Sequence, residues 1–118
     1  MISFTIPGEL IDLNNYINAE RTNKFRAAMI KKAETHRVMR EIQAAKVKKI
    51  TEPITEMICV WYTKNEKKDA DNVTFAIKFI LDGMVAAKIL PDDSRKWISC
   101  FTHIVDVGEK PRVEIEIR

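Results

Sequence analysis

The chain has 118 residues, of which 46% are hydrophobic and 31% charged, and its formal net charge is +3. This length predicts one domain spanning residues 1–118, because two domains would each be too small to bury a stable core. The composition argues against a disordered or membrane-spanning chain, since Gly and Pro are scarce and no apolar run approaches the length of a membrane span.

The first residues predict a short strand. Ile2, Phe4 and Ile6 alternate with polar residues, and Pro7-Gly8 ends the run. This alternation differs from the apolar core of a signal peptide, so we expect the protein to remain in the cytoplasm.

A long amphipathic helix is predicted next. No Gly or Pro occurs between Glu9 and Glu52, and the Asp and Asn residues that cluster before Thr22 favour a polar loop there. We therefore predict a loop up to about Thr22 and one helix from there to the residues before Pro53, with apolar side chains along one face.

Most of the positive charge lies in this region. Residues 17–49 contain ten Lys or Arg and three Glu, so their charge is +7, while the remainder of the chain carries −4. Such a segment can bind a polyanion, and the acid-rich remainder can bind cations. On charge alone, a solvated helix face is the favoured interpretation.

Residues 54–63 form a continuous apolar and aromatic run, which predicts a central strand covered on both faces. A charged loop, residues 64–68, follows it. The next segment, residues 72–87, is apolar nearly all round and predicts a buried helix with Asp71 as its N-cap. Gly83 within this helix predicts either close packing or a break.

Residues 97–107 and 112–117 predict two strands joined as an antiparallel hairpin. The complete order is β-α-β-α-β-β. This order predicts an α+β fold, a single two-layer domain with a small mixed sheet packed against helices. Cys59 and Cys100 are expected to be reduced and packed, since their spacing fits neither a disulfide framework nor a zinc site.

The segment after the central strand contains the residues with the clearest chemical implication. Asp69 and Asp71 lie one residue apart before the buried helix, so in an extended segment their side chains point to the same side. Carboxylates suit Mg²⁺, which takes oxygen ligands and keeps several waters beside a substrate phosphate. Asp is also a common N-cap, and on spacing alone that structural role is the more frequent explanation.

Two further features extend this candidate site. Lys78 lies on nearly the same helix face as Asp71 and can extend toward a phosphate held there, although a lysine on an apolar helix can also simply place its ammonium in water. Asp92 and Asp93 follow Pro91 and offer a third carboxylate, although this combination often only forms a turn.

Taken together, these residues resemble the signature of the RusA-type Holliday-junction resolvases. The matching features are Asp69-Ala70-Asp71-Asn72, then Lys78 with Asp82 four residues later, and Asp92-Asp93-Ser94. The resemblance spans essentially the whole chain, and it implies a homodimeric, Mg²⁺-dependent endonuclease that recognises four-way DNA junctions and nicks two opposed strands. One position departs from the pattern, because Phe75 stands where the family lysine is expected and a three-residue insertion is needed to place Lys78.

The resemblance also implies roles for individual residues. Asp69, Asp71 and Asp93 would bind one or two Mg²⁺ ions, with Mn²⁺ as a substitute. Lys78 would be the catalytic lysine, and Asn72 would support the active site. The cations expected to contact DNA phosphates are Lys67, Lys68, Arg21, Lys24, Arg26 and Lys31.

The predicted geometry leaves one difficulty. If the helix of residues 72–87 is straight, its far end lies more than about 20 Å from Asp71, and the chain can only just return to bring Asp93 there. Either the helix breaks or a second subunit supplies part of the site. Two other functions remain open at this point: a non-catalytic protein that binds DNA or a partner, and a nuclease that acts on other branched DNA.

Overall fold

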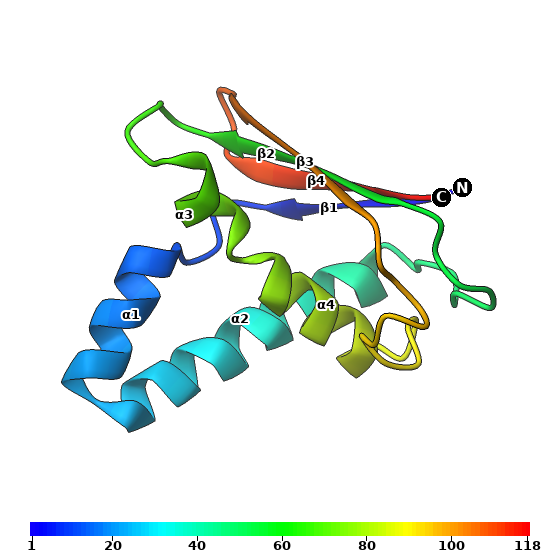
Figure 1. The fold of residues 1–118 in the computed structure, drawn as a ribbon, viewed down its shortest axis with the longest axis horizontal. Coiled ribbons are helices and arrows are strands. Elements are labelled where there is room, and N and C mark those ends of the chain that lie inside the picture. Colours follow the sequence, from blue (N-terminus) through cyan, green and yellow to red (C-terminus); the bar gives the residue numbers. More distant parts are fainter.

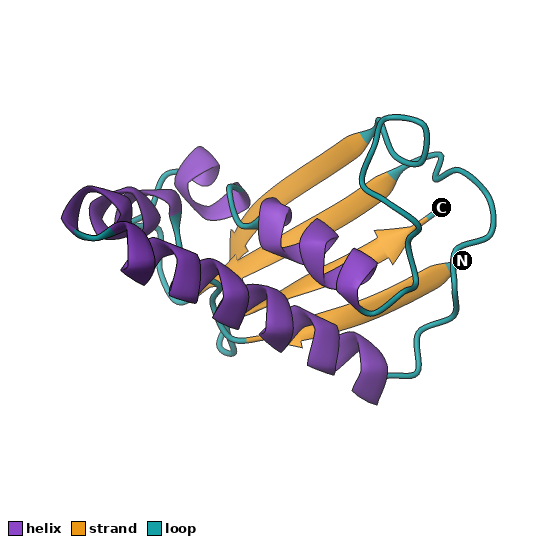
Figure 2. Ribbon diagram, turned by 90° about the horizontal axis from the view of Figure 1, so that it is seen from below, coloured by secondary structure: helices purple, strands orange, loops and turns teal.

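The computed structural model describes all 118 residues and shows a four-stranded mixed sheet with the helices on one of its faces (Figures 1 and 2). The strands are β1 (Ile2–Pro7), β2 (Met57–Thr63), β3 (Phe101–Val107) and β4 (Arg112–Ile117). The helices are α1 (Leu13–Thr22), α2 (Lys24–Ala44), α3 (Ala70–Thr74) and α4 (Ile77–Ala86). The predicted α+β class, with a small mixed sheet and a helical layer, is confirmed.

The strands are arranged β1-β4-β2-β3, so β4 and β2 are central and β1 and β3 form the edges. β4 runs antiparallel to both of its neighbours, whereas β3 runs parallel to β2. Alternate residues of each strand face the helices, and Phe4, Ile115 and Cys59 make one such buried row across three strands. The other face of β2 is only partly covered, so the prediction that both faces are buried is wrong.

The predicted hairpin between the last two strands is also wrong. β2 lies between β3 and β4, and residues 108–111 cross its end, where the Gly108 amide donates to the Thr63 carbonyl at 3.0 Å. The helix-facing residues of β2 are all buried, whereas β3 is largely exposed. The more apolar strand therefore takes the central place, and β3 lies at the edge.

The polar segment that follows β1 forms helix α1, where the sequence predicted a loop. Asp12 caps this helix, with the Asn15 amide donating to its carboxylate at 2.8 Å. Tyr16 supplies packing, since its ring centroid lies 5.5 Å from that of Phe75 and 5.8 Å from that of Phe79. These tertiary contacts outweigh the low helix propensity of the asparagines.

The predicted long helix corresponds to α2 and is shorter than expected. Asn23 is extended between α1 and α2, and its side chain accepts a hydrogen bond from the Phe25 amide at 2.8 Å, so a single residue makes the elbow between them. α2 ends at Ala44 because Lys46 adopts a left-handed conformation with φ of 52°, and the following amide donates to the carbonyl of Ile42.

The predicted buried helix is divided into α3 and α4. Tight turns at Phe75 and Ala76 replace regular helical bonds, and α4 then lies across the sheet (Figure 2). Gly83 marks close packing and not the break, since a Cβ at this position would lie 2.6 Å from the Cβ of Val38 on α2.

None of the helices combines the length and the apolar character that a membrane span requires. Both cysteines are free, as predicted. Cys59 is packed in the core, where burial raises the pKa of its thiol to about 12. Cys100 is exposed just before β3, so its predicted packing is wrong.

Candidate functional site

Asp69 and Asp71 lie together beyond the carboxyl end of β2, where the loop of residues 64–69 leads into α3. The sequence predicted Asp71 as the N-cap, but Asp69 holds that position, and its carboxylate makes no capping hydrogen bond. The Asp71 carboxylate accepts a bond from the adjacent Asn72 amide at 3.0 Å, and both aspartates are exposed. Capping therefore does not account for Asp69, and both carboxylates are accessible to a cation.

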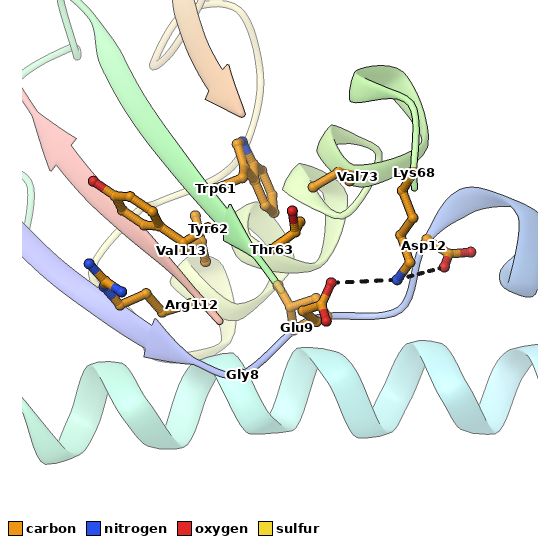
Figure 3. A pocket seen from close by; sticks show the side chains of 11 residues that line it. Gly8, Glu9, Asp12, Trp61, Tyr62, Thr63, Lys68, Val73, Arg112 and Val113 are labelled. Carbon is orange, nitrogen blue, oxygen red and sulfur yellow. Dashed lines mark ion pairs between the residues drawn. The ribbon is translucent and has the colours of Figure 1, made fainter. Parts of the chain in front are cut away.

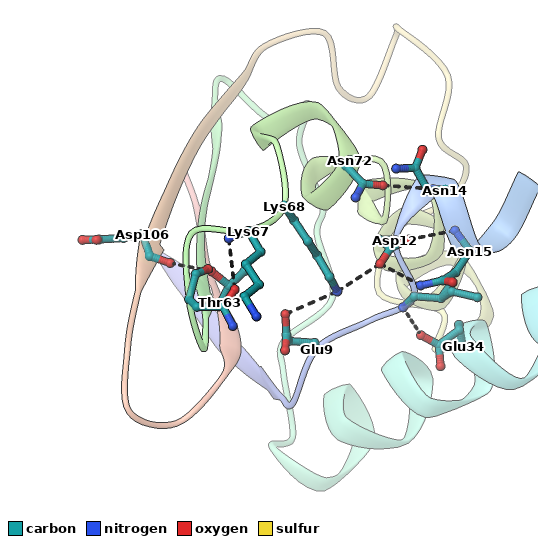
Figure 4. Close-up of polar contacts among 12 residues, drawn as sticks. Glu9, Asp12, Asn14, Asn15, Glu34, Thr63, Lys67, Lys68, Asn72 and Asp106 are labelled. Carbon is teal, nitrogen blue, oxygen red and sulfur yellow. Dashed lines mark hydrogen bonds and ion pairs between the residues drawn. The ribbon is translucent and has the colours of Figure 1, made fainter.

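The residue before Asp69 anchors this segment. The Lys68 ammonium lies 3.0 Å from the Asp12 carboxylate and 3.6 Å from that of Glu9 (Figures 3 and 4). Asp12 is only 4% exposed. Burial acts to raise its pKa, but the bond from the Asn15 amide and the charge of Lys68 outweigh this effect and hold the pKa below its ordinary value. Lys68, which the sequence assigned to DNA, is thus paired within the chain.

Asn72 joins the same region from α3. Its side-chain oxygen accepts a hydrogen bond from the Asn14 backbone amide at 2.9 Å (Figure 4). Asn14 lies in the first turn of α1, where backbone amides have no partner within the helix. Asn72 therefore fastens α3 to the start of α1, directly beside the two aspartates.

The loop that carries Asp93, between α4 and β3, lies at the opposite end of the sheet from α3 (Figure 1). Asp93 precedes β3, whereas Asp69 and Asp71 follow β2, and these two strands run parallel over seven residues each. A strand of this length spans about 20 Å. Accordingly, no group of three His, Cys, Asp or Glu side chains in the chain is arranged to hold a metal ion. The break between α3 and α4 does not bring the three carboxylates together.

The remaining predicted lysines near the aspartates are exposed. Lys67 lies in the loop before α3. Lys78 lies in the first turn of α4, at the end of α4 that is joined to α3. Neither takes part in an ion pair. Both ammonium groups are therefore available to an anionic ligand.

The predicted DNA-contacting cations of the helices surround the junction of α1 and α2. We call this surface, residues 21–32, the basic elbow. Its exposed cations are Arg21, Lys24, Arg26, Lys31 and Lys32. None of them pairs with a carboxylate. Two large apolar side chains also lie open here, Phe25 at 81% and Met29 at 71% exposure.

A small cavity lies beside Lys68, between the loop after β1 and the ends of β2 and β4 (Figure 3). Its volume of about 20 Å³ leaves room for about one water molecule. It cannot hold a nucleotide. Asp69 and Asp71 do not line this cavity and are exposed, as are Lys67 and Lys78.

The sequence did not indicate Asp12 or Glu9 as residues of this region. An Asp before a helix is an N-cap signal, which explains how Asp12 could be found as a cap if α1 itself were recognised. Its ion pair with Lys68 joins two distant parts of the chain, and no spacing rule reveals such a contact.

The residues fit a divalent cation in part. Mg²⁺ usually keeps several waters and binds one or two carboxylates together with a substrate phosphate, and the exposed oxygens of Asp69 and Asp71 meet that minimum. A third carboxylate at the same position would have to come from another chain, because Asp93 of this chain lies at the far end of the strands.

A protein-family model described as endodeoxyribonuclease RusA matches residues 12–118 of the chain. The matched range contains both central strands, the basic elbow and all three aspartates. No curated protein matches the sequence.

Proposed function

Because this chain belongs to the RusA family of endodeoxyribonucleases, which act on Holliday junctions, we propose that it resolves four-way DNA junctions by paired nicks in opposed strands. It acts as a homodimer, with one domain of residues 1–118 in each subunit. Each active site takes one or two Mg²⁺ ions, or Mn²⁺ in their place. The carboxylates are Asp69 and Asp71 from one subunit and Asp93 from the partner subunit.

The separation of the aspartates is the observation that carries this proposal. The chain has all three aspartates of the signature of a metal-dependent nuclease family, and all three are exposed. Asp93, however, lies about a strand length away from Asp69 and Asp71. A two-fold axis perpendicular to the strands sets the two subunits antiparallel, so that the end of the sheet that carries Asp93 in one subunit lies beside the end that carries Asp69 and Asp71 in the other. A symmetric dimer therefore supplies each pair of aspartates with the missing third carboxylate.

The edge strand β3 supports such a dimer. Its outer edge has no hydrogen-bonding neighbour, and Phe101, Ile104 and Val107 are 38%, 49% and 42% exposed. An edge of this kind is a ready template for another strand. Antiparallel pairing of β3 with its copy brings the start of one strand beside the end of the other, so the partner's Asp93 comes to the same end of the sheet as Asp69 and Asp71.

Other residues of the chain have separate roles in cleavage. When bound, a divalent cation lowers the pKa of the attacking water and neutralises charge on the scissile phosphate. Lys78, exposed and unpaired in the first turn of α4, stabilises negative charge that develops on the phosphoryl oxygens. Asn72 keeps α3 against α1 and so supports the position of Asp71.

Binding of the junction depends on different residues. The basic elbow and Lys67 hold backbone phosphates, a contact that is independent of base sequence and weakens with salt. Selection of four-way junctions comes from shape, because two equivalent sites related by a two-fold axis match the symmetry of the junction and reach two opposed strands.

Cleavage of a synthetic four-way junction in Mg²⁺ tests the proposal, with wild type compared with Asp71→Asn. Asp92→Asn is the matched control, since Asn can keep the hydrogen bond that Asp92 accepts from the Ser94 amide at 2.8 Å. Wild type and the control should give paired nicks, while Asp71→Asn should bind the junction without cutting it. Equal cleavage by wild type and Asp71→Asn would contradict the proposed site.

Two other outcomes would favour the alternative functions. Salt-sensitive DNA binding with no product in any divalent metal would indicate a non-catalytic binding protein. Faster cleavage of flaps or three-way junctions than of four-way junctions would indicate a nuclease for other branched DNA.

A further inference from the structure

Asp12 is the only charged residue that the fold buries, at 4% exposure. A buried carboxylate is costly unless it is paired and hydrogen-bonded. Asp12 meets both conditions, because Asn15 donates its amide at 2.8 Å and its side-chain nitrogen at 2.9 Å, and the Lys68 ammonium lies 3.0 Å away. Its charge is therefore matched to one particular lysine.

Helix capping does not require this charge. Asn caps helices about as well as Asp, so the bond to the Asn15 amide would be satisfied by a neutral residue. What Asn cannot provide is the ion pair with Lys68. The position of that lysine, directly before Asp69, suggests what the pair does.

The loop between β2 and α3 has few other attachments. The Thr63 hydroxyl donates to the Asn65 carbonyl at 2.7 Å, and the Lys67 amide donates to the Asn65 side chain at 3.0 Å, so both bonds are local. At the start of the loop, the Thr63 hydroxyl also contacts the Asp106 carbonyl at 3.3 Å, and the Thr63 carbonyl accepts from the Gly108 amide at 3.0 Å. Asp69 makes no side-chain bond. Across residues 64–69, the ion pairs of Lys68 are thus the only polar side-chain contacts with a distant part of the chain (Figure 4).

We infer that Asp12 and Lys68 are positioning residues of the metal site: their ion pair fixes the backbone that carries Asp69 and Asp71 against the start of α1. This inference rests on the proposed function, because the two aspartates matter only if they bind a cation. The bond between Asn72 and the Asn14 amide fixes the other side of the same segment. The two attachments also join the aspartates to α1, which leads into the basic elbow, so bound DNA and the metal ligands share one rigid support.

The test compares Asp12→Asn, Lys68→Met and the double variant with wild type. Asp12→Asn keeps the acceptor for the Asn15 backbone amide, and so the helix cap, but it removes the charge and the second acceptor oxygen to which the Asn15 side chain donates. The first readout is Mn²⁺ binding to the DNA-free protein by isothermal titration. Each single variant should bind Mn²⁺ about tenfold more weakly, as expected when a group that orients metal ligands is lost. The double variant should be no weaker than the singles, because both changes break one interaction.

Three further measurements separate positioning from other roles. Amide hydrogen exchange of residues 64–74 should accelerate in both single variants. Junction affinity in EDTA should stay near that of wild type, and cleavage should recover as the Mg²⁺ concentration is raised. Glu34→Gln is the control, since Glu34 accepts a bond from the Ile11 amide beside Asp12 but does not touch Lys68. It should bind Mn²⁺ like wild type.

Wild-type Mn²⁺ binding by both Asp12→Asn and Lys68→Met would overturn the inference. So would a loss of junction binding confined to Lys68→Met, which would assign this lysine to DNA. If Asp12→Asn and Lys68→Met bind Mn²⁺ like wild type while Asp71→Asn does not bind it, the inference fails but the proposed function stands. If wild type itself neither binds Mn²⁺ nor cuts DNA, the proposed function fails.

Discussion

Asp71 and Asp93 lie at opposite ends of two parallel strands, since Asp71 follows the end of β2 and Asp93 precedes the start of β3. Seven residues of strand separate these ends by about 20 Å. One cation cannot bridge that distance. A metal site that uses both carboxylates therefore requires two copies of the chain.

Asp93→Asn should lower junction cleavage at least about a hundredfold, because it removes a proposed metal ligand, an effect larger than that of losing an orienting partner. Binding to the junction in EDTA should be unchanged, since the basic elbow is untouched. Single-turnover cleavage and gel-shift titrations measure the two quantities. Asp92→Asn should behave like wild type in both, and a defect as large as that of Asp93→Asn would contradict the choice of Asp93.

Arg26→Ala should weaken junction binding mainly at low salt. Log affinity falls with log salt concentration, and the loss of one phosphate contact makes this fall less steep by about 1 unit of slope. Lys49→Ala is the control, because Lys49 is exposed beyond the far end of α2, about 30 Å along this helix from the elbow. Equal slopes for wild type and Arg26→Ala would show that this part of the elbow does not bind DNA.

The pKa of Asp12 predicts how acid affects stability. Burial raises this pKa, but the Asn15 amide and Lys68 lower it more, so the folded value lies below the ordinary one. The resulting stability is complete above the unfolded pKa of about 3.9 and is lost as the pH falls through the folded pKa. Urea unfolding should show the advantage of wild type over Asp12→Asn at pH 7 shrinking below about pH 4. A constant difference would contradict this role of the charge.

Gly83→Ala should destabilise the protein, because the new Cβ meets the side chain of Val38. Overpacking of this kind costs about 1 to 3 kcal/mol, partly offset by the better helix propensity of Ala. In the double variant, Val38→Ala should make room for the new Cβ, so the double variant should lose less stability than the sum of the two single losses. Thermal unfolding of the two single variants and the double variant measures this coupling, and strictly additive effects would show that the residues do not interact.

Much of the fold could be predicted because local patterns determine it. The alternation in residues 2–6 and 113–117, the apolar run of β2 and the apolar segment after Asp71 were each sufficient to indicate an element. The strand order was not predictable in the same way. A four-residue connection usually joins neighbouring strands, but here β2 pairs on both sides and β3 is left at the edge.

The errors in the helices have a common cause. α1 was predicted as a loop because its asparagines favour turns, yet Tyr16 packs on Phe75 and Phe79, which no local pattern reports. For the same reason, spacing and the family signature could predict Asp69, Asp71 and Asp93 as site residues, whereas the tertiary ion pair of Asp12 could not be predicted. The distance between Asp71 and Asp93 also depends on the parallel pairing of β2 with β3, which the sequence did not reveal.

Mixing Asp71→Asn with Asp93→Asn tests the shared site most directly. Each variant alone should be inactive. In a mixed dimer, the Asp93→Asn subunit supplies an intact Asp71 and its partner supplies an intact Asp93, so one of the two sites is complete. Random mixing in equal amounts should therefore restore roughly a quarter of the wild-type sites, seen as single nicks in four-way junctions. An inactive mixture, after subunit exchange is verified by mass spectrometry, would mean that the two carboxylates do not act across the subunits.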